Sequence, residues 1–387
     1  MRRGETGRYE GVVAGGESVR AFVPAPLPPA PPLVLDGGLE RTLEGAVAGV
    51  GRLDGVSTLL PSRELFLYTY VRKEAVLSSQ IEGTQSSLAD LLLFELDEVP
   101  GVPLDDVVEV SSYVAALDHG LARMRSGFPL SSRLIREIHG VLLAKGRGSS
   151  KEPGEFRRTQ NWVGGSRPGN AVFVPPPHSA VPECMAVLER FLHADDDGLS
   201  MLVRAALAHV QFETIHPFLD GNGRVGRLLI TLLLCHAGLL REPLLYLSLY
   251  LKQHRAEYYA LLDAVRRDGD WEAWLAFFLR GVRETADGAF STAQRLVAMF
   301  DRDREQIEAS GRRAGSALRV HDAMKARPIV SLPAVCEATG LSFPAASSGM
   351  EVLEGLGIAS ELTGKKRKRL WRYAGYVDVL SEGTEVA

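Results

Sequence analysis

Residues 216–227 read HPFLDGNGRVGR and stand directly before a long apolar run, LLITLLL. Within twelve positions they combine a histidine, an aspartate, two glycines around an asparagine, and two arginines. The fifteen residues before them, MLVRAALAHVQFETI, have an apolar helical pattern. The stretch therefore predicts a glycine-rich loop that joins two helices and begins the second one.

The start of the second helix is predicted to bind an anion. Gly221 and Gly223 let the backbone approach a ligand closely. A helix N-terminus presents unsatisfied amides and the positive end of its dipole, which suits phosphate. Arg224 and Arg227 are three residues apart, so they share a helix face and can hold oxygens that carry several negative charges.

Two further residues of the stretch suggest chemistry on a phosphate. Asp220 is a hard carboxylate beside the anion site, and Mg²⁺ is commonly held by one or two carboxylates together with substrate phosphates. His216 as a neutral imidazole can accept a proton near pH 7. The pattern Gly221 to Gly226 also matches a dinucleotide fingerprint, but the helical pattern before it and the lack of parallel strands after it exclude that interpretation.

The stretch resembles the signature of the Fic family, His-x-Phe-x-Asp/Glu-Gly-Asn-Gly-Arg-x-x-Arg, at every defined position. The resemblance extends to the segment before it, to RAEYY at 255–259 and to the N-terminal region. It implies a helical Fic fold and transfer of AMP from ATP to a Ser, Thr or Tyr hydroxyl of a protein, including the chain itself. Mg²⁺ is then the expected cofactor, ATP the co-substrate and pyrophosphate the leaving product.

The resemblance also implies a role for each residue of the motif. His216 would deprotonate the target hydroxyl, and Asp220 would hold Mg²⁺ against the α- and β-phosphates. The phosphates themselves would be held by Gly221, Asn222 and Gly223 as an anion cradle, by Arg224 along the phosphate chain and by Arg227 at the γ-phosphate. Tyr258 and Tyr259 are candidates for the adenine pocket, with core packing as the alternative.

Residues 158–177, RTQNWVGGSRPGNAVFVPPP, hold two short β-type runs around a Gly- and Pro-rich tip. They predict a hairpin, which is almost the only strand signal in the first 300 residues. The hairpin resembles the family's flap, which holds the target segment as an added strand. The residues that would dock the target are Gln160, Asn161, Trp162 and Val163.

The residues 78–83, SSQIEG, suggest a built-in brake. Ser78 and Glu82 are four apart on one helix face, and Glu82 lies near a helix C-terminus, where the dipole disfavours a negative charge. Ser-x-x-x-Glu-Gly is similar to the inhibitory-helix motif of the family. The resemblance implies that Glu82 pairs with Arg227, so that ATP binds in an unproductive pose.

The fold is predicted to be mainly α, with a helical Fic-type core, a β-hairpin flap and a C-terminal winged helix-turn-helix. The expected division is 1–110 for the N-terminal region with the inhibitory helix, 111–309 for the core and 310–387 for the winged unit. Helical patterns occupy 62–95, 104–125, 130–144, 179–194, 199–214, 224–239, 253–266 and 270–309. The proline-rich residues 22–35 are expected to be extended.

The last eighty residues differ in pattern and in charge. Three short helical patterns at 316–326, 332–339 and 343–356 precede two short runs around a basic tip, which is the order of a winged helix. Residues 314–373 hold 9 Lys and Arg against 5 Asp and Glu, and 365–369 are all cationic. DNA is therefore a predicted partner for residues 310–387, with protein docking as the alternative.

The whole chain has a net charge of −4, which gives no reason to expect membrane or general nucleic-acid binding. Its three scattered cysteines and the absence of an apolar leader predict a cytoplasmic protein. A homodimer is a further partner that the sequence leaves open. Three alternatives to AMP transfer from ATP also stay open: another nucleotide donor, removal of AMP by a water that Glu82 positions, and a mainly DNA-binding regulator.

Overall fold

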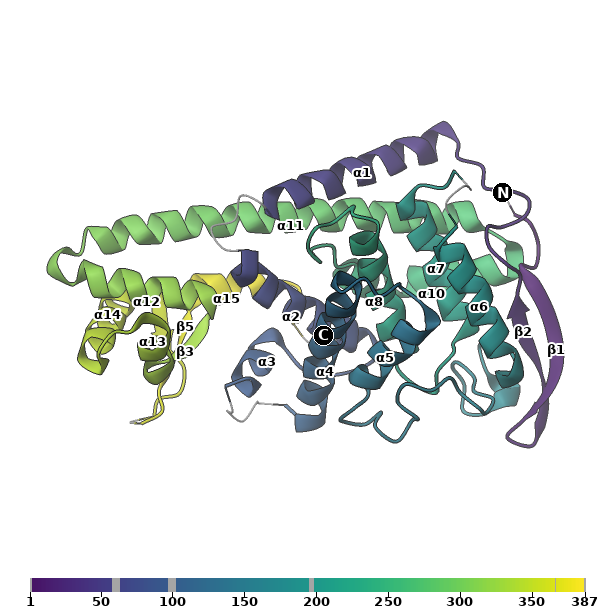
Figure 1. Cartoon of the computed structure of the whole chain (residues 1–387), viewed down its shortest axis with the longest axis horizontal. Helices are drawn as coiled ribbons and strands as arrows, with labels where there is room; N and C mark the ends of the chain where they lie inside the picture. Colours follow the sequence, from purple (N-terminus) through teal and green to yellow (C-terminus); the bar gives the residue numbers. More distant parts are fainter. Residues whose placement is uncertain (1, 58–62, 97–101, 195–197, 366, 386–387) are drawn as a thin grey trace.

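The structure is a computed structural model that describes residues 2–57, 63–96, 102–194, 198–365 and 367–385. It is mainly helical, as the sequence predicts, and the long helix α11 (Trp271–Glu308) runs along it (Figure 1). The other helices are α1 (Gly37–Ser57), α2 (Arg63–Ile81), α3 (Leu88–Phe94), α4 (Leu104–Arg125), α5 (Ser132–Leu142), α6 (Val181–Leu192), α7 (Met201–Ile215), α8 (Asn222–His236), α9 (Ser248–Gln253), α10 (Arg255–Asp268), α12 (Ala314–Ala326), α13 (Leu332–Thr339), α14 (Phe343–Gly355) and α15 (Ala374–Ser381). The strands are β1 (Gly7–Ala14), β2 (Glu17–Pro24), β3 (Ile329–Ser331), β4 (Ala359–Glu361) and β5 (Leu370–Tyr373).

Helices α7 and α8 form the centre of the larger, N-terminal part. Both are apolar around most of their circumference, and Leu207, Phe212 and Leu229 are almost completely buried. A helix of this kind is stable only when other elements surround it, and α4, α6 and α11 pack against this pair. The loop of the motif joins the two helices, so its functional residues lie at one end of a rigid, buried pair.

Helix α1 is not predicted by the sequence pattern because glycine recurs along it. Glycine inside a helix costs about 1 kcal/mol relative to alanine. Helix α1 lies along α11 (Figure 1), and its glycines allow a close approach. A Cβ added to Gly49 would be 3.3 Å from the Cβ of Ala286, and one added to Gly45 would be 3.3 Å from the Cδ of Arg283. Packing against α11 therefore stabilises a helix that its propensity does not favour.

Strands β1 and β2 form an antiparallel hairpin, which corrects the prediction that residues 158–177 hold almost the only strand signal in this part of the chain. Ala14 pairs with Glu17 across Gly15 and Gly16, which have φ values of +54° and +82°. Two such glycines are a strong hairpin signal, which the sequence carries. The Phe22 N–H donates to the Val174 carbonyl (2.9 Å), so this hairpin supports the 158–177 segment.

The predicted flap hairpin is reduced to one antiparallel bridge, between Val163 and Phe173. The Val163 N–H donates to the Phe173 carbonyl at 2.8 Å, and the Phe173 N–H donates back at 3.1 Å. Gly164 and Gly165 have φ values of +68° and +71°, so the chain turns away from a ladder immediately after the bridge. The flap is therefore a loop closed by a single pair rather than a continuous hairpin.

The part after α11 has the order α12, β3, α13, α14, β4, β5, with a sheet of strand order β3-β5-β4. This order fits the expected winged helix-turn-helix, and the loop between β4 and β5 forms the wing (Figure 1). Helix α15 then returns to the N-terminal part, where the hydroxyls of Tyr376 and Thr69 on α2 are 3.1 Å apart. Within the described residues, no helix is long and apolar enough to cross a membrane.

Candidate active site

His216 ends helix α7 in a left-handed conformation, with φ 49° and ψ 59°. This conformation is uncommon outside glycine and is often found at functional positions. Burial lowers the pKa of His216 to about 4, and the nearby cations Arg157 and Arg266 act in the same direction. With its pKa this low the ring is neutral at pH 7 and carries a single proton. One ring nitrogen therefore carries the proton, and the other is left as an acceptor.

Two residues that the sequence did not single out hold the loop after His216. Arg157 is almost fully buried, and its Nε donates to the His216 carbonyl at 2.9 Å. His139 on α5 stacks on Phe218, with ring centroids 3.7 Å apart. Its Nδ1 accepts the Gly154 N–H (2.9 Å), so its Nε2 carries the proton and donates to the Asp220 carbonyl (3.1 Å). No local pattern marks either residue, because both act across long sequence separations.

The residues predicted to form an anion cradle lie at the first turn of α8. Gly221 precedes it with φ +75°, and the first N–H groups of the helix have no intrahelical acceptor. The side chain of Asn222 is used within the loop, since it accepts from the Phe218 N–H and donates to the Phe218 carbonyl, both at 2.9 Å. A Cβ built on Gly223 would collide with Oε1 of Glu82, which shows that this carboxylate lies directly over the cradle.

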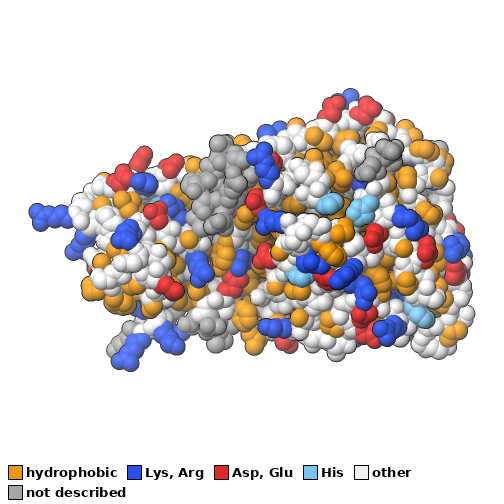
Figure 2. All heavy atoms as spheres, in the orientation of Figure 1, with side chains coloured by type: hydrophobic (Ala, Val, Ile, Leu, Met, Phe, Trp, Pro, Cys, Tyr) orange, Lys and Arg blue, Asp and Glu red, His pale blue; other side chains and the backbone are white. Residues whose placement is uncertain are grey.

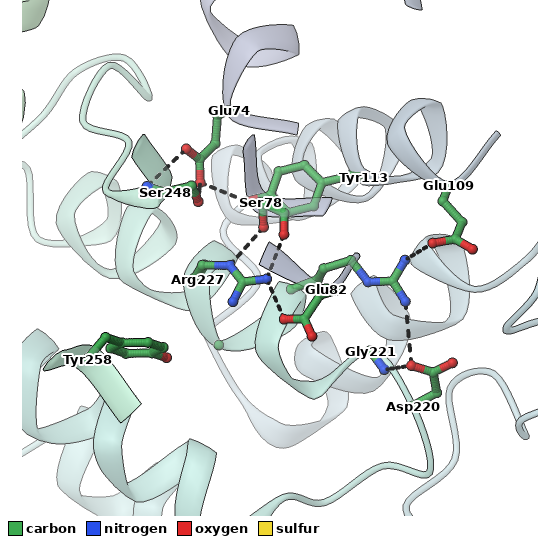
Figure 3. Close-up of polar contacts among 12 residues, drawn as sticks. Glu74, Ser78, Glu82, Glu109, Tyr113, Asp220, Gly221, Arg227, Ser248 and Tyr258 are labelled. Carbon is green, nitrogen blue, oxygen red and sulfur yellow. Dashed lines mark hydrogen bonds and ion pairs between the residues drawn. The ribbon is translucent and has the colours of Figure 1, made fainter. Parts of the chain in front are cut away.

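Arg227 and Glu82 form the predicted pair (Figure 3). Arg227 Nη2 donates to Glu82 Oε1 at 2.7 Å and to the Ser78 carbonyl at 2.9 Å. Arg227 Nε donates to the Ser78 hydroxyl at 2.9 Å. The structure thus brings together three residues that belong to α2, its C-terminal turn and α8, up to 149 positions apart in the sequence.

The electrostatics of this pair favour two charged partners. Burial alone would raise the pKa of Glu82, but the Arg227 guanidinium holds that pKa below its ordinary value. The pKa of Arg227 is raised in turn by Glu82, against the effect of its own burial. The Arg227 side chain is 2% exposed and that of Glu82 is 37% exposed. The cation is therefore fixed inside the protein, whereas its anionic partner can be displaced toward solvent.

A polar cluster behind Ser78 fixes helix α2. Tyr113 on α4 donates to Glu74 on α2 at 3.3 Å (Figure 3). The Ser248 hydroxyl donates to the same carboxyl group of Glu74. Burial raises the pKa of Glu74 to about 7, although the hydrogen bonds from Ser248 lower it. Helix α2 is thus held to α4 and α9 by buried hydrogen bonds, and not by the pair with Arg227 alone.

Asp220 and Arg224 lie beside the cradle. Asp220 Oδ1 accepts the Gly221 N–H at 2.6 Å, and Arg224 Nη2 is 3.6 Å from the same oxygen. The Asp220 side chain is 44% exposed, so it can reach a ligand from solvent. Arg224 is buried, and its Nε has no acceptor among the described residues. A buried donor of this kind suits an anionic oxygen that arrives with a ligand.

The residues present suit a metal that arrives with a nucleotide. In the described part of the chain, no three His, Cys, Asp or Glu side chains lie close enough to form a metal site. Asp220 is an exposed hard oxygen ligand beside the cradle, and one carboxylate is sufficient for Mg²⁺ when substrate phosphates and water complete its shell.

The two tyrosines proposed for the adenine pocket differ in position. Tyr258 is 1% exposed, and its hydroxyl lies 2.9 Å from Nε2 of His209 in the core. The expectation that Tyr258 faces a ligand is therefore corrected. Its ring packs in the core against the rings of Trp274 and His209. Tyr259 is 42% exposed, so it is the member of the pair that can meet an adenine ring.

The four flap residues lie between the motif loop and the 173–176 segment. Asn161 Nδ2 donates to the Phe218 carbonyl at 3.0 Å, which ties the flap to the motif. Gln160 Nε2 donates to the Pro175 carbonyl at 3.0 Å. Trp162 is 37% exposed, and Val163 forms the bridge described above. Gln160 and Asn161 therefore hold the flap, and the Trp162 side chain is exposed on it.

The basic residues of the wing lie far from this site. Lys365, Arg367 and Lys368 are exposed, and Lys and Arg side chains gather at the wing tip (Figure 2, lower left). Helix α14, which would be the recognition helix, contains no Lys or Arg and carries Glu351 and Glu354. The run of exposed cations thus lies on the wing and not on helix α14.

Family models match two consecutive parts of the chain. The Fic/DOC family N-terminal model matches residues 41–122, and the Fic/DOC family model matches residues 129–234, which include the whole motif. A protein adenylyltransferase Fic of Culex quinquefasciatus is 35% identical over 212 residues, which are 54% of this chain and 39% of that protein. The Drosophila melanogaster protein of the same name is 32% identical over 210 residues, with 54% and 39% coverage. The chain thus spans about two fifths of the length of these curated relatives.

Solved structures show the same fold. A Fic family protein from Desulfovibrio desulfuricans superposes with a TM-score of 0.59 at 20% identity, over 89% of this chain and 98% of that one. Fic-1 from C. elegans superposes with a TM-score of 0.51 at 25% identity, over 68% and 73%. Residues 41–122 and 129–234 of the chain are therefore the two consecutive domains of the Fic/DOC family, and the solved structures show that the fold around them is the same.

Proposed function

We propose that this chain transfers AMP from ATP to a hydroxyl group of a protein, itself included, and that Glu82 restrains the reaction. The observation that carries the proposal is the carboxylate of Glu82 over the N-terminus of α8, paired with Arg227 at 2.7 Å. An anion of the protein already occupies a place built for a phosphate. The names of the curated relatives agree with this activity.

In this proposal, His216 serves as the general base. The target hydroxyl attacks the α-phosphorus of ATP, its proton passes to the free ring nitrogen of His216, and the bond from the α-phosphorus to pyrophosphate breaks. The lowered pKa of His216 keeps the ring neutral and ready to accept a proton at pH 7. The left-handed backbone at His216 and the hydrogen bond from Arg157 fix the direction of the ring before substrate arrives.

The triphosphate would lie along the first turn of α8. The helix N-terminus and the unpaired Nε of Arg224 stabilise its negative charge, and Arg227 holds the γ-phosphate once Glu82 has left. Asp220 would hold Mg²⁺, which supplies further neutralisation of the phosphates when it is bound. The restraint follows from competition: Glu82 and the γ-phosphate need the same guanidinium.

The choice of donor gives a direct test. A chain with Glu82→Gly, incubated with Mg²⁺ and α-labelled ATP, GTP, UTP or CTP, should become labelled most strongly from ATP. The same chain with His216→Ala is the control for label that is not transferred enzymatically. Stronger labelling from another nucleotide would identify that nucleotide, and not ATP, as the donor. If none of the four labels a folded protein, nucleotide transfer is contradicted.

The exposed cations of the wing favour a second function, which is binding of duplex DNA through its phosphates. Since α14 carries no Lys or Arg, we expect two unrelated duplexes to bind the full chain equally well. Replacing Lys365, Arg367 and Lys368 with alanine should lower the slope of log affinity against log salt by about one unit per lost phosphate contact. Absence of a mobility shift at low salt would exclude this function.

A further inference from the structure

Arg224 has a second carboxylate partner that lies outside the motif. Its Nη1 is 3.2 Å from Oε2 of Glu109 on α4, and its Nη2 is 3.6 Å from Oδ1 of Asp220 (Figure 3). The side chains of Arg224 and Glu109 are 5% and 9% exposed, whereas that of Asp220 is 44% exposed. Glu109 is therefore the closer and the more deeply buried of the two partners.

Asp220 has two competing demands in the proposed reaction. As the ligand of Mg²⁺ it must give its charge to the metal, yet it also faces the guanidinium of Arg224. A buried arginine that loses its counter-charge is strongly unfavourable. If Asp220 were the sole carboxylate beside Arg224, the arginine would hold Asp220 back from the metal until the phosphates had replaced its charge. The carboxylate of Glu109 removes this conflict.

We propose that Glu109 is a positioning residue that keeps Arg224 compensated and oriented, and so leaves Asp220 available to the metal that accompanies a nucleoside triphosphate. The inference rests on the proposed function, because it assigns the metal to Asp220. Glu109 does not touch the substrate in this scheme. It acts through Arg224 and determines how strongly metal and nucleotide favour each other's binding.

The surroundings of Glu109 fit this task. Its other oxygen accepts from Arg147 Nε at 2.7 Å, and Arg147 Nη2 is 3.0 Å from Oδ1 of Asp106, one turn earlier on α4. Asp106 Oδ2 accepts the N–H of Gln85, three residues after Glu82, at 2.7 Å. Glu109 thus belongs to a series of polar contacts that runs from Gln85, just after the SSQIEG residues 78–83, to Arg224 at the phosphate cradle. An orienting group needs such fixed partners of its own.

A purely structural role for Glu109 is the alternative, since a buried ion pair also affects folding. The two roles differ in what they predict for the metal. Loss of a structural contact weakens ATP binding with and without Mg²⁺ alike. Loss of the proposed positioning weakens only the gain in ATP affinity that Mg²⁺ provides. Without the Glu109 charge, Arg224 pairs more strongly with Asp220, and Asp220 is then less available to the metal.

The test measures ATP binding by calorimetry in a chain with Glu82→Gly and His216→Ala, which cannot turn over. The quantity of interest is the ratio of the Kd in EDTA to the Kd in saturating Mg²⁺. Glu109→Gln, which is isosteric and neutral, should reduce this ratio about tenfold, as is typical for groups that orient metal ligands. The Kd in EDTA should change much less than the ratio.

Two further variants make the result interpretable. Glu95→Gln removes a carboxylate that pairs with Arg72 at 2.8 Å outside the site, and it should leave the ratio unchanged. Glu109→Asp keeps the charge on a shorter side chain and should retain more of the ratio than Glu109→Gln does. An unchanged ratio in Glu109→Gln, or an equal loss of affinity in EDTA and in Mg²⁺, would overturn the inference. If Mg²⁺ has no effect on ATP binding before Glu109 is changed, the metal part of the proposed function fails, and the inference fails with it.

Discussion

Replacing Glu82 with glycine should raise self-labelling from α-labelled ATP by about two orders of magnitude, which is the contribution typical of one preorganised charge donor. In the structure Arg227 is committed to Glu82 at 2.7 Å and to Ser78, and the Glu82 carboxylate lies over the α8 cradle. Removing that carboxylate frees both the guanidinium and the space for a γ-phosphate. The rate of label incorporation at saturating ATP, compared with the parent, measures the effect.

The gain should depend on Arg227. Glu82→Gly combined with Arg227→Ala should lose most of the increase, because two groups in contact at one site act non-additively. Glu82→Gln retains the helix-end side chain and removes only its charge, so it should also activate, to a lesser extent. ADP lacks the γ-phosphate, and its affinity should therefore respond less than that of ATP. Unchanged labelling by a folded Glu82→Gly protein would refute the restraint.

The local part of the site could be predicted from the sequence because its chemistry is contiguous. The spacing of Arg224 and Arg227, and the two glycines before them, predict a helix N-terminus with cations on one face, and the structure has this arrangement. The pair of Glu82 with Arg227 is different. The two residues are 145 positions apart, so their contact followed only from resemblance to a family.

The groups that hold the site in place could not be predicted. Arg157, His139 and Glu109 reach the motif from other elements, through contacts 59, 81 and 115 residues distant in sequence. The residues around each of them form no local motif that would mark it as part of the site. Tyr258 shows the converse case, since a tyrosine beside a nucleotide site has the same sequence signal whether its ring faces the ligand or the core.

The fold shows the same limits. Most helices lie close to their predicted ranges because their apolar faces repeat regularly, and α4, at Leu104–Arg125, has the predicted bounds. Helix α1 depends on its contact with α11, which a pattern confined to residues 37–57 does not contain. The β1–β2 hairpin is the opposite case, because the Gly-Gly pair at its turn is a hairpin signal that the local sequence does contain.

Replacing His216 with alanine should lower AMP transfer by about 10²–10⁴-fold, the usual loss when a general base is removed. The comparison is best made in the Glu82→Gly chain, where the starting rate is high enough to measure such a loss. His119→Ala is a suitable control, because His119 pairs with Glu137 at the surface and takes no part in the motif loop. ATP affinity should remain close to that of the His216 form, since the imidazole is assigned to the hydroxyl and not to the phosphates.

The pH dependence gives a second, independent readout of the same assignment. A base must be neutral to act, and burial favours neutral His216 by lowering its pKa to about 4. An unperturbed histidine, with a pKa of about 6.5, would lose its activity as the pH falls from 7 to 5. The acid limb of kcat/KM, which reports the free enzyme, should therefore lie well below pH 6. Removing Glu82, whose charge raises the pKa of His216, should move that limb further down. An acid limb near 6.5, or near-normal labelling by folded His216→Ala protein, would assign the base to another group.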